Sequence, residues 1–299
     1  MKNTWIGILT LVLLALPLTG AGAEQLKLKY LHTIYTDAGD VALKSPHGVT
    51  CTDNYVFVAD SGNKRIVRYT YKDGMVTPDA SFDVPKMFPI MVQQNDKGEL
   101  YVLDGRDRRI AILSADGAPK GVLDPKAVPG PQKVVPRSFR ITPDGTIAIL
   151  DIFSERVLLL DSNGKFQKQI PFPADYGFFS DLAIDKQGTI YILDSVKAVV
   201  YQALKGEDKF AALTGGMKDN MNFPTSLAPD NKGNIYLVDQ YGSGLAVIGI
   251  DGSFQGRKLG MGWSDSHLYY PTEISISNRG DIFIADRGNN RVQQFTVAE

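Results

Sequence analysis

The 299-residue sequence contains one cysteine, Cys51, and only three histidines, His32, His47 and His267. A single cysteine excludes an intramolecular disulfide, a zinc ribbon and a CxxC redox centre. Net charge is also small, with 32 Lys and Arg against 33 Asp and Glu, which argues against nucleic-acid binding or membrane-surface attachment through bulk charge. No nucleophile elbow or phosphate loop is present. Hydrophobic residues make up 43% of the chain, enough to build a folded core.

The longest apolar run lies near the amino terminus, at residues 6–18. Lys2 precedes it, and Ala21-Gly22-Ala23 follows as an A-x-A cleavage pattern. The run is too short for a good membrane span, although an uncleaved anchor helix is the alternative. We therefore predict a signal peptide at 1–23 and a mature protein at 24–299, exported to the periplasm or the extracellular space without a membrane span.

A short apolar run closed by an aspartate occurs six times. The aspartates are 44, 47, 43, 45 and 47 residues apart, and a glycine or asparagine stands six residues before each one. These runs do not alternate between apolar and polar residues, so both faces of each strand should be buried. The six aspartates are Asp60, Asp104, Asp151, Asp194, Asp239 and Asp286.

Each repeat has the pattern of four short strands joined by tight turns, which is typical of a β-propeller blade. The sixth repeat is incomplete, because the chain ends four residues after Phe295 without a second turn. An unassigned strand-like segment, residues 26–35, is available at the other end. The sequence therefore predicts an all-β, six-bladed propeller of four-stranded antiparallel blades, with the last blade closed by the N-terminal strand.

Two repeats carry a fuller motif. The first has Pro-x-Gly at residues 46–48 and Ala-Asp-x-x-Asn-x-Arg at 59–65, and the last repeats the second part at 285–291. These repeats resemble the NHL family. The resemblance spans 24–299 and implies an NHL-type propeller, a fold that serves scaffolds, binding modules and a few enzymes.

The six aspartates could form a metal-binding ring, but a structural role is the simpler interpretation. An aspartate at a strand end can accept hydrogen bonds from the backbone of the following turn. An arginine stands five residues later in four of the repeats, and we expect it to pair with that turn or with a neighbouring blade.

In a propeller, the loops that enter the first strands share one face with the loops between second and third strands; we call this the loop face. Its candidate binding residues are His47 and Arg137, which enter first strands, and Trp263, His267 and Tyr270 of the longest inter-blade loop. Rim aromatics suit recognition of a protein, peptide or glycan, although packing of the loop against the blades is the alternative. The residues at the six equivalent entry positions are His47, Ile90, Arg137, Ser180, Thr225 and Thr272.

The resemblance also brings two enzyme alternatives. A peptide-amidating lyase with a similar propeller holds zinc through Pro-His motifs, of which only Pro46-His47 is matched here. Calcium-dependent lactonases place acidic groups around the channel, where Asp181 and Glu273 could supply carboxylates. We predict a non-enzymatic binding or scaffold module without a cofactor, and keep a zinc- or calcium-dependent enzyme as the alternative.

Overall fold

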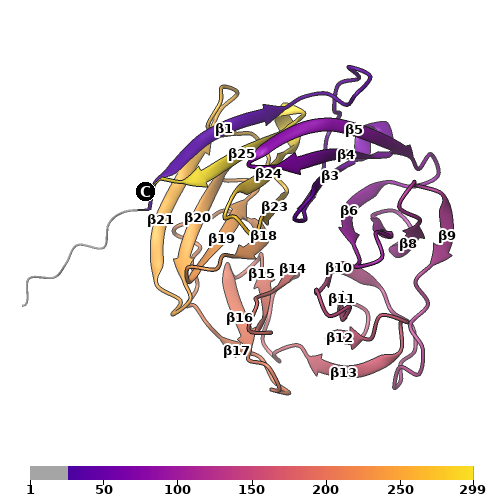
Figure 1. Cartoon of the computed structure of the whole chain (residues 1–299). Helices are drawn as coiled ribbons and strands as arrows, with labels where there is room; N and C mark the ends of the chain where they lie inside the picture. Colours follow the sequence, from indigo (N-terminus) through magenta and orange to yellow (C-terminus); the bar gives the residue numbers. More distant parts are fainter. Residues whose placement is uncertain (1–25, 299) are drawn as a thin grey trace, which may run out of the picture.

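Six β-sheets surround a central axis in the computed structural model, which describes residues 26–298 (Figure 1). Within each sheet the first strand lies nearest the axis, and the apolar run that ends in aspartate is the second strand. The predicted six-bladed, all-β propeller is confirmed. In the described part of the chain, no helix has the length and apolar character to cross a membrane. The predicted signal peptide lies outside this part.

The first three blades are regular four-stranded antiparallel sheets. Blade 1 contains β2 (Gly48–Cys51), β3 (Tyr55–Asp60), β4 (Arg65–Lys72) and β5 (Met75–Asp83). Blade 2 contains β6 (Pro89–Gln94), β7 (Leu100–Asp104), β8 (Arg109–Leu113) and β9 (Pro119–Val122). Blade 3 contains β10 (Pro136–Ile141), β11 (Ile147–Asp151), β12 (Arg156–Leu160) and β13 (Phe166–Pro171).

The other three blades vary at their outer edges. Blade 4 contains β14 (Phe179–Ile184), β15 (Ile190–Asp194), β16 (Val199–Ala203) and a two-residue β17 (Ala211–Ala212). Blade 5 contains β18 (Pro224–Pro229), β19 (Asn234–Asp239), β20 (Gly244–Gly249) and β21 (Phe254–Met261), and adds a short parallel strand, β22 (His267–Leu268). Blade 6 contains β23 (Glu273–Ile276), β24 (Ile282–Asp286), β25 (Arg291–Val297) and β1 (Leu28–Ile34).

The ring closes through β1, which pairs antiparallel with β25 (Figure 1). Ile34 at the end of β1 is buried in the core between blades 6 and 1, while Tyr30 packs edge-on against Phe295 at 6.1 Å between ring centroids. The predicted closure of the last blade by the N-terminal strand is therefore confirmed. His32, also on β1, pairs with Gln294 at the outer edge of the blade, as predicted.

The core lies between neighbouring blades. Along β3, Val56 and Val58 pack in one cluster with Phe283 of blade 6, whereas Phe57 packs in another with Val102 of blade 2. Side chains of a strand alternate between its two faces, so a strand between two blades must be apolar at every position. This arrangement explains why the second-strand runs do not alternate.

The six strand-end aspartates are completely buried. Asp60 accepts a hydrogen bond of 2.7 Å from the backbone N–H of Lys44, which lies in the loop that enters its own blade. The same contact recurs in every blade. The sequence predicts that each aspartate bonds with the turn that follows it. The structure adds a second partner, the loop that enters the blade, and this loop bonds with the aspartate in all six blades. The donors in blades 2 to 6 are Phe88, Val135, Phe178, Phe223 and Tyr269.

The arginine five residues later reinforces this contact in three blades. Its Nε donates to the aspartate at 2.7 to 3.1 Å in the pairs Arg65–Asp60, Arg156–Asp151 and Arg291–Asp286. Blade 2 differs, since Arg109 pairs with Asp107 at the surface and Asp104 Oδ2 is left without a partner.

Replacing Asp286 should be costly, because it removes the closest charge partner of the buried Arg291. We expect Asp286→Ala to lower the free energy of unfolding by about 3 kcal/mol or more, measured by urea denaturation. Asp107→Ala breaks an exposed pair and should cost less than about 1 kcal/mol. Similar losses in the two variants would contradict the structural role of the buried carboxylate.

The pairing of β1 with β25 gives a second prediction, which concerns the stability of the closed ring. Ile34→Ala should destabilise the protein by about 2–4 kcal/mol, because it empties a site in the core between blades 6 and 1. Leu31→Ala, at an outward position on the same strand that is 38% exposed, should change the stability by about 0.5 kcal/mol or less. Deleting residues 24–36 should lower the melting temperature further. An unchanged melting curve after this deletion would contradict closure.

Candidate functional site

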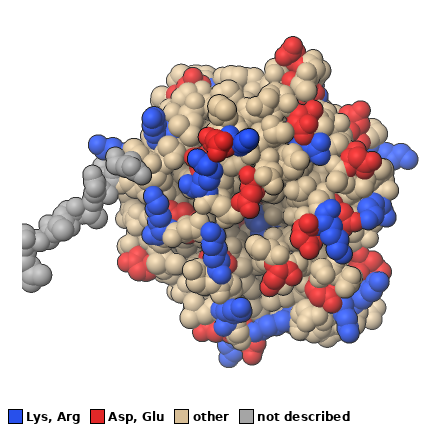
Figure 2. Space-filling model, viewed as in Figure 1, with Lys and Arg blue, Asp and Glu red and all other residues tan. Residues whose placement is uncertain are grey.

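The central channel has a cavity at each end. The cavity at the loop face has a volume of about 60 Å³, and the cavity at the opposite face, among the turns between first and second strands, has a volume of about 680 Å³. Glu273 lines both cavities, so the two are separated by the side chains around it. Figure 2 shows acidic and basic side chains interspersed on the visible face, without a large patch of one sign.

The loop-face cavity collects the residues that enter the six first strands. The six positions that the repeats identify as equivalent all line it, so the structure brings His47 and Arg137 together at the channel mouth. The six are His47, Ile90, Arg137, Ser180, Thr225 and Thr272.

The surroundings of His47 favour its neutral form and leave little space around it. Burial lowers the pKa of His47 to about 4, and the nearby cations Arg287 and Arg137 add to this effect. Its imidazole is therefore neutral at physiological pH. The next residue, Gly48, must be small, since a Cβ there would lie 2.6 Å from the carbonyl oxygen of Ile90 and 2.7 Å from Glu273 Oε2.

A buried charge cluster blocks the channel below this cavity. Arg140 donates to both carboxylate oxygens of Asp181, at 3.1 and 3.0 Å, and its Nη2 lies 3.5 Å from Glu273 Oε1. Asp181 also accepts hydrogen bonds from the hydroxyls of Ser138 and Ser226, at 2.5 and 2.8 Å. One guanidinium thus serves two carboxylates, and Asp181 makes the closer contacts.

Glu273 holds its proton at neutral pH. Burial raises the pKa of Glu273 to about 8, against the opposing effect of Arg140 and of the hydrogen bond from the Val49 N–H, which is 3.1 Å long. The pair that the calcium alternative requires does meet at the channel, but the cation in contact with both carboxylates is Arg140. Among residues 26–298, no group of three or more His, Cys, Asp and Glu side chains is arranged to hold a metal ion. The cluster therefore fits an internal ion pair better than a metal site.

Five aromatic side chains form a continuous row on the loop face of blades 5 and 6. We call this row the aromatic chain; neighbouring ring centroids lie 4.7 to 6.2 Å apart. Trp263 is 73% exposed, Tyr241 51% and Tyr270 37%, so the row faces solvent. In order, its members are Phe223, Tyr241, Tyr270, Tyr269 and Trp263.

The predicted site residues thus fall into three places. His47 and Arg137 line the channel mouth, and Trp263 and Tyr270 belong to the aromatic chain. His267 lines neither cavity; it is exposed, and its Nδ1 lies 3.0 Å from the Ser264 hydroxyl. The parallel pairing of β22 with β21 holds this part of the loop at the outer edge of blade 5.

Sequence reasoning missed several exposed residues of the loop face. Phe153, Val196 and Tyr241 each stand two residues after a strand-end aspartate, at the tip of the following turn, and are 51%, 47% and 51% exposed. Comparing the repeats at that one offset would have found them. Arg108, four residues after Asp104, was also missed.

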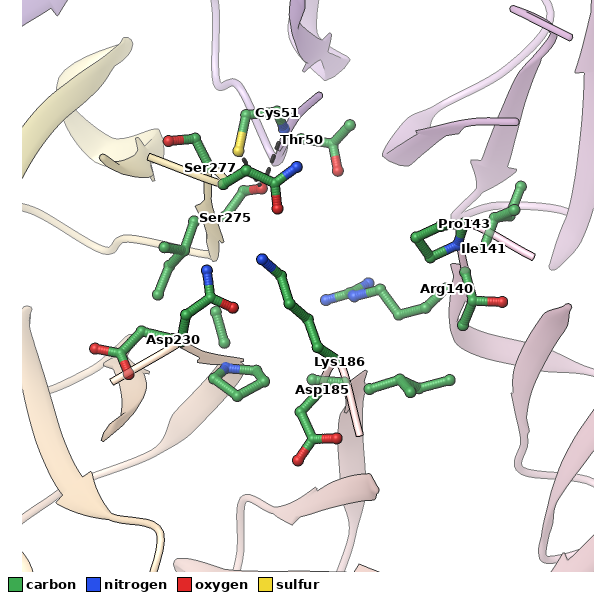
Figure 3. A pocket seen from close by; sticks show the side chains of 18 of the residues that line it. Thr50, Cys51, Arg140, Ile141, Pro143, Asp185, Lys186, Asp230, Ser275 and Ser277 are labelled. Carbon is green, nitrogen blue, oxygen red and sulfur yellow. Dashed lines mark hydrogen bonds between the residues drawn. The ribbon is translucent and has the colours of Figure 1, made fainter. Parts of the chain in front are cut away.

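The larger cavity at the opposite face was not predicted either. Figure 3 shows Lys186 and Arg140 pointing into it from two neighbouring blades. Its wall includes Cys51, whose thiol lies 3.1 Å from the Ser275 hydroxyl. Burial raises the pKa of Cys51 to about 12, so the thiol stays protonated and unreactive near neutral pH.

These features define the chain as a six-bladed β-propeller. Its last blade carries an NHL repeat, because the family model described as NHL repeat matches residues 268–295. This match confirms the resemblance to NHL repeats and covers one of the six blades. A search of curated proteins finds no match.

Solved structures share the fold at low sequence identity. Virginiamycin B lyase from Staphylococcus aureus aligns with a TM-score of 0.59 and 14% identity, over 91% of this chain and 100% of that one. A gluconolactonase from Xanthomonas campestris gives 0.62 and 14%, over 90% and 99%. An auxiliary nutrient binding protein from Bacteroides thetaiotaomicron gives 0.66 and 13%, over 92% and 78%. At this identity the likeness shows the fold alone.

The raised pKa of Glu273 has a consequence for stability. Between about pH 4.5 and 8 the unfolded chain releases this proton and the folded protein keeps it, so the wild type loses stability as the pH rises through this window. Glu273→Gln removes the titration. We expect its unfolding free energy, relative to wild type, to increase by roughly 3 kcal/mol from pH 5 to 8 in urea titrations.

The exposed Glu207→Gln is the matched control, and its difference from wild type should stay constant over the same range. A Glu273→Gln difference that is also flat would show that Glu273 is ionised in the folded protein.

Proposed function

We propose that this protein is an exported NHL-type propeller that binds a protein, peptide or glycan partner on its loop face. The observation that carries the proposal is the aromatic chain, which presents Tyr241, Tyr270 and Trp263 to solvent on two adjacent blades. Exposed aromatic residues in a connected row are typical of recognition surfaces, because their rings bury a large area at little cost in conformational entropy. Loops held on a rigid sheet scaffold are the usual place for such surfaces.

The chemistry of the channel supports binding over catalysis. Asp181 is already engaged by Arg140 and two serine hydroxyls, and Glu273 shares the same guanidinium. His47, with its lowered pKa, carries no charge at neutral pH. The structural neighbours include both enzymes and a nutrient binding protein, so the fold alone does not choose between these roles.

Export is part of the proposal and rests on the apolar run and cleavage pattern within residues 1–23. An extracytoplasmic protein with a single cysteine must be stable without disulfides. The closure of the ring by β1 provides a noncovalent link between the two ends of the described chain.

A capture experiment tests the recognition surface. The mature protein is immobilised and used to capture partners from the cell envelope and from culture medium, in parallel with the double variant Tyr241→Ala/Trp263→Ala. We expect the double variant to lose at least about tenfold in affinity for a captured partner, since truncating aromatic anchors removes most of their binding energy.

Phe254→Ala is the control, because Phe254 is an exposed aromatic residue of the same blade that follows the turn between its third and fourth strands. It should bind as the wild type does. If the double variant retains every partner at full affinity, the aromatic chain is not the recognition surface.

A further inference from the structure

Two arginines from adjacent blades have unsatisfied donors at the loop face. Arg137 Nε and Arg108 Nη1 are buried, and each lacks a hydrogen-bond partner. In the described part of the chain, they are the only buried side-chain donors of which this is true. A buried charged donor without a partner costs free energy, so its presence in a folded protein needs a physical explanation.

The two guanidinium groups interact electrostatically, and of the two only Arg137 lines the loop-face cavity. Arg108 lowers the pKa of Arg137, in addition to the effect of burial. Arg137 is held in place against the ring of Phe178, 5.2 Å from its centroid, and lines the loop-face cavity beside His47. Two like charges held together and partly shielded from water repel one another, unless an anion lies with them.

Among the described residues, no carboxylate pairs with these donors. Asp181, the acid that acts on Arg137 electrostatically, already accepts hydrogen bonds from Arg140, two serine hydroxyls and two backbone N–H groups. Asp104, in the strand before Arg108, leaves Oδ2 without a partner and so does not satisfy Arg108 either. These two donors are therefore free to bind an anion from outside the chain.

The size of the cavity limits what this anion can be. About 60 Å³ corresponds to roughly two water molecules, which is enough for a carboxylate and too little for a sugar ring or other drug-sized group. Guanidinium groups bind carboxylates through paired N–H donors, and such charge-assisted bonds are among the stronger ones in proteins.

We propose that the channel mouth at the loop face is a carboxylate-binding site, in which Arg137 and Arg108 donate to the bound oxygens. This inference deepens the proposed function and partly rests on it: the partner on the aromatic chain is a peptide that places a carboxylate in the mouth. A small free carboxylic acid offers the same group, and the experiment distinguishes these two sources.

Thermal unfolding in sodium formate and in sodium chloride, at equal ionic strength and pH 7, tests the carboxylate site itself. We expect formate to raise the melting temperature of the wild type by about 2 °C, through preferential binding to the folded state. Arg137→Gln and Arg108→Gln should lose this gain. Arg106→Gln, at an exposed position in the same turn as Arg108, is the matched control and should retain it.

Comparing the melting temperatures of the variant and the wild type in chloride shows whether Arg108 stabilises the fold by itself or serves to bind an anion. Because the two arginines repel each other, Arg108→Gln should melt in chloride at or above the wild-type temperature. A lower melting temperature in chloride, or an equal formate gain in wild type and Arg137→Gln, would overturn the proposal.

Calorimetry with short peptides identifies the source of the carboxylate. An acetylated Tyr-Gly-Gly peptide with a free terminal acid should bind at least tenfold more tightly than formate, whereas its amidated form should show no binding. Affinity no greater than that of formate would overturn the peptide source. The variant Tyr241→Ala/Trp263→Ala should keep formate binding and lose the additional peptide affinity, so failure of the aromatic chain and failure of the carboxylate site give different results.

Discussion

The fold depends on one repeated contact, between a buried carboxylate at the end of each second strand and the backbone of the loop that enters the same blade. In all six blades this aspartate is inaccessible to solvent and accepts an N–H from a residue 16 or 17 positions earlier. Removing a hydrogen bond from a buried carboxylate is costly, so the loop cannot leave without a large penalty. Each entry loop is thereby fixed to its own blade, and the six entry residues line one small cavity.

Each blade buries its apolar side chains against both of its neighbours, so every blade depends on the ring being closed. Each second strand is apolar at every position because both of its faces contact a neighbouring blade, as Val58 and Phe57 do in β3. An open end would expose one such face. The strand β1 prevents this by completing blade 6 and contributing Ile34 to the core between blades 6 and 1. The closed ring therefore supplies the stability that disulfides give to many exported proteins.

The fold was readable from the sequence because its information is local and periodic. The run before Asp60 recurs at a nearly constant spacing, and the segment around Tyr30 was the one strand without a place in any repeat. The same constant spacing identified the entry positions of the first strands, including His47 and Arg137. The resemblance to NHL repeats agreed with both.

The parts that escaped prediction depend on contacts between blades or on the path of an irregular loop. Arg140 meets Asp181 of the adjacent blade and Glu273 across the axis, through side-chain directions that no single repeat encodes. Arg108 lies in the turn after β7 and acts electrostatically on Arg137, whereas the neighbouring Arg109 faces solvent. His267 lies away from the axis because β22 adds to the edge of blade 5, a pairing without a repeat signature.

The cluster of Arg140, Asp181 and Glu273 makes the propeller a body with two separate vestibules instead of a tunnel. A solute that enters from one side meets a charged partition, and the buried Glu273 lines both compartments. The two vestibules share only Glu273 among their lining residues, so every other lining residue belongs to one vestibule alone.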